Sequence, residues 1–321
     1  MFFLSRHGWT FSKPLMYKDK TLMKGLGYDT VAGAVVGGIA LGWRQWVKRK
    51  NKTVEGSEEE GGIKEAVTGR PEVPWKIPRE VRKDIPKTIV ILVIAFLLSG
   101  YFAFVVEQFL FLMAGYGAPL TVATTRAWKV LLGHLAWVFM GIRILRRLKP
   151  FFPKEGTWLK WRWNSNWLWW AIGGYYVSSL FFIMADGLNR FVLPSSMFDK
   201  ETVVTRLINP ENKDRWAMAI GFIAPCMSAP IFEEVLYRGF LLPALTCYFP
   251  MWAALPVSSV LFAIHHMNPT AIIPLTILGL IWALIYKRSG NLLVTILIHA
   301  MWNSRVFLGS FLDLGSFTDF E

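Results

Sequence analysis

The sequence predicts an all-α protein, a polytopic membrane bundle of seven or eight transmembrane helices around a polar cavity. Of its 321 residues 54% are hydrophobic, and they include 16 tryptophans and 24 phenylalanines. This composition is too apolar for an ordinary soluble protein. Long apolar stretches also recur along the chain, and their lengths match a bilayer whose hydrocarbon core is about 30 Å thick.

Seven apolar stretches are long enough to cross a membrane as helices. They cover residues 88–115, 124–145, 167–188, 216–247, 250–267, 270–286 and 291–312. A shorter apolar stretch at 28–43 contains two Gly-x-x-x-Gly spacings, which let helices approach closely. This short segment could cross the membrane or lie at its surface, and its glycines could dock a partner in a membrane protein complex.

The rest of the N-terminal part is polar. Residues 1–27 are basic, as expected of a targeting or membrane-surface segment. Residues 44–87 contain charge clusters and four prolines in their second half, and they show no hydrophobic period. We therefore expect a polar linker without a core of its own, followed by a membrane domain over residues 88–321.

The formal net charge of +13 is explained by orientation in the membrane. The excess basic residues lie in loops that flank the apolar stretches. Nucleic-acid binding is not expected, because no soluble domain interleaves basic with aromatic residues. Membrane lipids are the expected surroundings of most of the chain.

Two adjacent glutamates interrupt the apolar stretch 216–247. A charged side chain near the bilayer centre costs about 2.5–3.5 kcal/mol, so both are expected to face the bundle interior. Glu234 and Arg238 are four residues apart and share a helix face, so Arg238 can neutralise Glu234. Glu233 points about 100° away and stays free to act as a general base. A purely structural Glu–Arg pair that fixes helix packing is the alternative.

The next apolar stretch ends in two histidines. His266 follows Phe262 by four residues, so the phenyl ring can wall one side of the imidazole. His265 points elsewhere and is expected at the membrane interface or in a supporting position. A single intramembrane histidine is usually a hydrogen-bonded packing residue, but here other polar groups accompany it.

The last apolar stretch carries His299 and Asn303 one turn apart. Both side chains can donate, and two donors aimed at one point can hold an oxyanion. An interhelical hydrogen bond is the alternative.

Three separate stretches thus place polar groups in lipid, which indicates a site that activates water. Glu233, His266 and His299 could also bind zinc and leave a fourth position open. The same residues can activate water without a metal, and the sequence contains no His-Glu-x-x-His helix that would favour one.

In these motifs the chain resembles the CAAX prenyl protease and bacteriocin-processing family of intramembrane endopeptidases. The family motifs Glu-Glu-x-x-x-Arg, Phe-x-x-x-His and His-x-x-x-Asn stand here at residues 233–238, 262–266 and 299–303. The resemblance covers about residues 216–310, and the flanking residues look like those of bacterial, cyanobacterial and plastid members.

The resemblance implies a helical bundle with a water-filled cavity. It implies that Glu233 activates water with help from His266, and that His299 and Asn303 form the oxyanion site. The other motif residues would support the site: Glu234, Arg238 and Phe262.

The expected function is that of an intramembrane endopeptidase. Its substrate would be a membrane-anchored segment or a prenylated C-terminal tail. The alternative is a non-proteolytic membrane scaffold or regulator that keeps the protease-like fold and binds membrane protein partners. The residues in and around the motifs favour a plastid membrane as the location. The bacterial inner membrane and the endoplasmic reticulum are the alternatives.

Overall fold

The structure is a computed structural model, and it describes residues 42, 75, 77, 79–148, 151, 159–163, 166–198, 203–208, 210 and 214–311. Within these ranges every regular element is helical, which confirms the all-α class. The predicted segments 1–27 and 28–43 lie outside the described residues apart from residue 42, as does most of the linker 44–87. The predicted boundaries and roles of these three segments therefore remain predictions.

Within the part of the chain that the structure describes, five helices are long and apolar enough to cross a membrane. They are α3 (Ile85–Gly115), α4 (Val122–Leu145), α5 (Trp167–Val192), the composite helix Arg215–Leu245, and Pro269–Ser289, which includes α11 (Ile272–Ser289). Two further predicted stretches are also helical, namely the shorter α10 (Met251–His265) and α12 (Leu292–Phe311). By length and composition the chain is a multi-pass membrane protein, while the predicted total of seven or eight spans and the polar cavity stay predictions.

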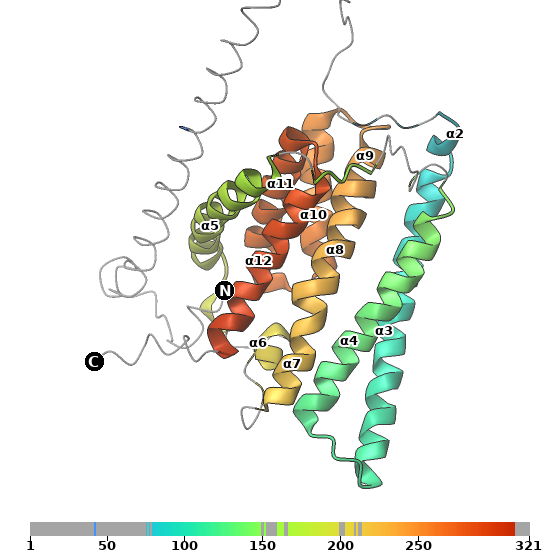
Figure 1. The fold of residues 1–321 in the computed structure, drawn as a ribbon, viewed down its shortest axis with the longest axis vertical. Coiled ribbons are helices and arrows are strands. Elements are labelled where there is room, and N and C mark those ends of the chain that lie inside the picture. Colours follow the sequence, from blue (N-terminus) through green and yellow to red (C-terminus); the bar gives the residue numbers. More distant parts are fainter. Residues whose placement is uncertain are drawn as a thin grey trace, which may run out of the picture.

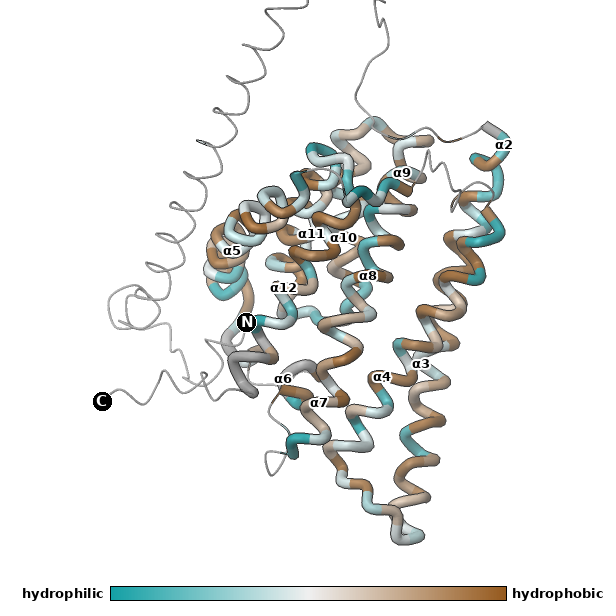
Figure 2. Tube along the Cα trace, viewed as in Figure 1, coloured by the Kyte–Doolittle hydropathy of each residue, from teal (hydrophilic) through white to brown (hydrophobic). Residues whose placement is uncertain are grey.

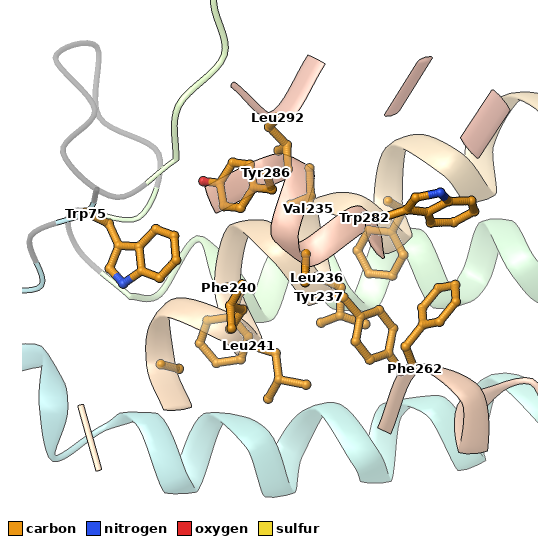
Figure 3. Packing of buried hydrophobic residues seen from close by; sticks show 14 of the residues in the cluster. Trp75, Val235, Leu236, Tyr237, Phe240, Leu241, Phe262, Trp282, Tyr286 and Leu292 are labelled. Atoms are coloured by element: carbon orange, nitrogen blue, oxygen red, sulfur yellow. The ribbon is translucent and has the colours of Figure 1, made fainter. Parts of the chain in front are cut away.

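The first long helix starts earlier than the sequence predicted. α3 begins at Ile85 rather than at residue 88, with Pro86 in its first turn, where a missing N–H costs nothing. The short helix α2 (Arg79–Arg82) precedes it. Trp75, from the predicted linker, is buried and stacks on Tyr286 with ring centroids 5.8 Å apart (Figure 3). The end of the predicted linker therefore belongs to the packed body.

Capping side chains fix the starts of two neighbouring helices. Thr121 and Thr124 form a capping box at the start of α4. Asp214 caps α7 (Arg215–Ile223) by accepting two backbone N–H groups of its first turn. The Thr121 hydroxyl donates to Asp214 over 2.7 Å, which ties the two helix starts together.

The helices form a bundle around the central helix that carries both glutamates. In Figure 1, α3 and α4 pack as a pair on one side, and α10, α11, α12 and α5 lie on the other. α11 packs against both α10 and α5, and α12 packs against α5 and α8 (Ala229–Glu234). Figure 2 shows apolar residues along most of α3, where many large apolar side chains are exposed, as expected of a face toward lipid.

The central helix is interrupted by two π-helical segments. η4 (Ala224–Ser228) precedes α8, and η5 (Val235–Leu241) follows it before α9 (Leu242–Leu245). Segments of this kind are rare and occur frequently at functional sites. Here they flank the six-residue α-helical turn that ends in the two glutamates.

Gly141 lets α4 approach the central helix, because a Cβ at this position would overlap the ring of Phe232. We expect Gly141→Ala to lower the free energy of unfolding by about 1–3 kcal/mol, the usual cost of overpacking. Thermal unfolding in detergent micelles measures the change. Gly173→Ala in α5 is the matched control, because an added Cβ there meets no atom within 4 Å. Equal midpoints for the two variants would contradict the close approach.

Candidate functional site

The two adjacent glutamates have different surroundings. The Glu234 side chain is 0% exposed, whereas the Glu233 side chain is 12% exposed. Neighbouring residues of a helix point about 100° apart, so one turn presents its two carboxylates to two different sides. One glutamate therefore belongs to the packed interior, and the other reaches a partly open position.

Glu234 anchors a buried polar network. Its Oε1 accepts from Arg238 Nη1 over 2.7 Å and lies 3.1 Å from His299 Nδ1, while Oε2 has no partner among the described residues. Arg238 also donates through Nη2 to the carbonyl of Gly279 over 3.0 Å. The contact between Glu234 and Arg238 that the four-residue spacing predicted is present, and His299 joins it.

Aromatic rings enclose the buried pair. The Arg238 guanidinium lies 4.6 Å from the ring centroid of Phe262 and 5.4 Å from that of Trp282. Trp282 also packs on His299 with centroids 4.5 Å apart, and its indole N–H donates to Ser178 over 2.9 Å. Sequence reasoning missed Trp282 and Ser178, because tryptophan and serine in apolar stretches carry no signal that separates them from ordinary packing residues.

Glu233 faces His266. The distance from Glu233 Oε2 to His266 Nε2 is 3.8 Å, and the side chains are 12% and 29% exposed. The other ring nitrogen of His266, Nδ1, lies 2.8 Å from the carbonyl of Phe262. The Phe262 ring packs edge-on against the imidazole with centroids 4.7 Å apart, as the spacing predicted. The structure thus brings Glu233, His266 and Phe262 together.

His299 and Asn303 do not aim at one point in this structure. His299 directs Nδ1 to Glu234, although it also interacts electrostatically with Glu233. Asn303 donates through Nδ2 to the carbonyl of Pro225 over 2.7 Å. The predicted pair of oxyanion donors is therefore not assembled, and one amide N–H of Asn303 is already used in packing.

A proline explains the hydrogen bond of Asn303. In η4 the N–H of Ala229 bonds to the carbonyl of Ala224, five residues back. The same pattern would pair the Pro225 carbonyl with the N–H of residue 230, but Pro230 has none. Asn303 supplies the missing donor from α12, and so it holds that helix against the segment that carries the glutamates.

We expect Asn303→Ala to lower the free energy of unfolding by about 1–3 kcal/mol, because it leaves the Pro225 carbonyl without a donor. Pro230→Ala restores a backbone N–H at the position that can reach this carbonyl. The double variant should therefore lose less stability than the two single changes predict when added. Chemical denaturation of all four proteins measures the coupling, and simple additivity would contradict this role for Asn303.

The three candidate zinc ligands do not form a metal site. Over the described ranges, no group of three or more His, Cys, Asp and Glu side chains is placed to hold a metal ion. Among the candidates, His299 turns Nδ1 toward Glu234, and only Glu233 and His266 face each other. The residues present do not fit zinc, and no catalytic step is assigned to a metal.

A fourth histidine of the bundle interacts electrostatically with His265, and sequence reasoning did not single it out. His134 of α4 has a buried Nε2. The position of His134 within an apolar stretch could have identified it, because ionisable residues are rare there and are usually functional. His265 packs among aromatic rings, with centroids 4.5 Å from Phe96, 6.1 Å from Trp137 and 5.8 Å from Tyr237. It therefore occupies a supporting position within the bundle.

Comparisons with known proteins point to the same part of the chain. Residues 215–305 match the family model of Rce1-like type II CAAX prenyl endopeptidases. The chain is also 26% identical over 139 residues to a Bacillus subtilis protein named "Putative membrane peptidase YdiL", covering 43% of this chain and 54% of that protein. The chain thus spans about half the length of this curated relative. No solved structure matches the chain.

Proposed function

We propose that the chain is a membrane peptidase that hydrolyses a peptide bond with water activated between Glu233 and His266. Similarity to the prenyl endopeptidase family over residues 215–305 supports the reaction class. The different surroundings of the two glutamates support the assignment of roles. Glu234 is fully buried and bound to Arg238, so Glu233 is the carboxylate that can meet a substrate.

The observation that carries the proposal is the pair of atoms that face each other. His266 Nδ1 lies at hydrogen-bond distance from the Phe262 carbonyl, which can only accept, so Nδ1 carries the proton. In the neutral ring Nε2 then bears a lone pair, and it faces another acceptor, Glu233 Oε2, across 3.8 Å. That distance is too long for a direct hydrogen bond.

One water molecule between these atoms satisfies both of them. It donates one hydrogen to each, and its oxygen keeps lone pairs for attack. Glu233 Oε2 is buried and has no other hydrogen-bond partner among the described residues, so it is available for such a water. This is the arrangement that a general base requires.

The reaction follows from this position. The water oxygen bonds to the carbonyl carbon of the peptide while one of its protons passes to the Glu233–His266 pair. The pair then passes this proton to the amine nitrogen as the C–N bond breaks, leaving one carboxylic acid, which keeps the other water proton, and one amine.

The proposed substrate is a protein held at the membrane, either by an apolar segment or by a prenylated C-terminal tail. The name of the matching family supports a prenylated tail. A plastid membrane remains the predicted location, with the bacterial inner membrane and the endoplasmic reticulum as alternatives, and a fluorescent fusion imaged with organelle markers separates them. Partner binding through residues 28–43 also remains a prediction, since that segment lies outside the described residues.

Comparison of membrane peptide termini tests the proposed function. Cells that express the unchanged chain should contain peptide termini that are missing from cells with Glu233→Gln at equal protein levels. These termini would identify the substrate. Identical sets of termini, together with normal growth of the variant strain, would instead indicate the non-proteolytic scaffold.

A further inference from the structure

Three ring nitrogens near the candidate site have no hydrogen-bond partner within the described part of the chain. They are His134 Nε2, Trp137 Nε1 and His265 Nε2, and all three atoms are buried. His134 and Trp137 lie about one turn apart on α4, and His265 is the last residue of α10. The rings of Trp137 and His265 have centroids 6.1 Å apart, and His134 interacts electrostatically with His265. Two helices therefore present polar atoms to one buried region.

The hydrogen-bonding chemistry of these atoms is complementary to water. His134 hydrogen-bonds the backbone of Ser228, and because its Nε2 is unpartnered this bond uses Nδ1. An Nδ1–H that donates to a carbonyl leaves a lone pair on Nε2, so this atom accepts. The indole N–H of Trp137 can only donate, and His265 Nε2 can do either. One water can accept from Trp137, donate to His134 and bond His265, which gives the three bonds typical of a buried water.

Apolar rings wall the region and limit what it can hold. Phe96 of α3 packs on His265 with centroids 4.5 Å apart and on Trp137 with centroids 5.6 Å apart. Phe232 of α8 meets the Trp137 ring edge-on at 5.3 Å. A metal ion does not suit the set, because an indole N–H donates and cannot ligate. Since buried polar groups in native proteins are satisfied by protein atoms or by ordered water, water is the occupant that fits.

The region adjoins the Glu233–His266 pair at His266. Phe232 directly precedes Glu233, and His265 directly precedes His266, with imidazole centroids 6.1 Å apart. Hydrolysis consumes one water for each bond broken, so a water held beside the pair can replace the one that reacts. We propose that His134, Trp137 and His265 bind a resident water, and that this site supplies water to the Glu233–His266 pair. The supply role rests on the proposed function, whereas the binding of water does not.

Magnetic resonance of the full chain in phospholipid nanodiscs tests the binding of water. With isotope-labelled tryptophan, the indole signal that disappears in Trp137→Phe belongs to Trp137. We expect magnetisation to pass from water to this indole proton in the unchanged chain and in Glu233→Gln. The transfer should be lost in His134→Leu and kept in His134→Gln, whose amide oxygen can still accept. Absence of transfer in the unchanged chain, or equal transfer in His134→Leu, would overturn the site.

Kinetics tests the supply role with the same variants. His134→Leu should lower kcat about tenfold with KM unchanged, because substrate binding is not altered. Gly173→Ala in α5, where an added Cβ meets no atom within 4 Å, lies outside the region and should keep kcat. An unchanged kcat in His134→Leu would overturn the supply role alone. If the unchanged chain hydrolyses no peptide, the proposed function and the supply role both fail, while the magnetic resonance result still decides whether water is bound.

Discussion

Glu233→Gln should slow peptide hydrolysis at least about a hundredfold and leave the protein folded in the membrane. Glutamine has nearly the same shape as glutamate, but its amide cannot take a proton from water. General base catalysis contributes about 10²–10⁴-fold, and kcat should fall by at least the lower figure. The measurement is turnover of the purified chain in nanodiscs, on a peptide taken from the termini that differ between cells. Because the Glu233 side chain is partly exposed and Arg238 pairs with Glu234 instead, thermal unfolding should change little.

Glu234→Gln is the matched control, since it makes the same chemical change one residue away. Glu234 is fully buried and carries the contacts to Arg238 and His299, so its variant should lose stability. The two variants should therefore differ in kind, with one losing turnover and the other losing folded protein. Full turnover by Glu233→Gln would contradict the assignment of the base.

Arg238→Leu should be the most destabilising single change in the described bundle. The arginine neutralises a glutamate that is 0% exposed and also donates to the Gly279 carbonyl. Its removal leaves a buried charge and a buried carbonyl without their partners, which costs about 3–5 kcal/mol for the broken pair. A loss of this size is a large fraction of the stability of an ordinary domain. Unfolding by denaturant in detergent micelles measures it.

The double variant Glu234→Gln with Arg238→Met provides the control for this loss. It removes both charges and fills the space with side chains of similar length. Replacing a whole buried pair is often close to neutral, so the double variant should be more stable than Arg238→Leu. If both proteins unfold at the same denaturant concentration, the stability contribution assigned to the pair is wrong.

Contacts within a single helix were predictable from the sequence. The four-residue spacing placed Arg238 on Glu234 and Phe262 beside His266, because helix geometry alone fixes which residues share a face. Helix positions were likewise predictable, because apolar length determines which segments suit a bilayer. Glu233 and His266 belong to different helices. That they work together was expected from the resemblance to a known family.

Contacts that depend on how helices rotate and shift against one another were not predictable. The contact of Asn303 with the Pro225 carbonyl follows from a π-helical segment whose donor position is occupied by Pro230, and no sequence pattern indicates it. The positions of Trp282 over His299 and of His265 beside Trp137 also depend on helix packing. In the sequence Trp282 and Trp137 cannot be told from ordinary packing residues until neighbouring helices are placed.

The most direct test of water activation by Glu233 and His266 is peptide hydrolysis in water enriched in heavy oxygen. Attack by water places one solvent oxygen in the new terminal carboxylate, and mass spectrometry of the product detects it. We expect one heavy oxygen per product from the unchanged chain, and at least about a hundredfold less labelled product from Glu233→Gln in the same time. Cleavage without incorporation, or equal labelled product from the variant, would contradict the account.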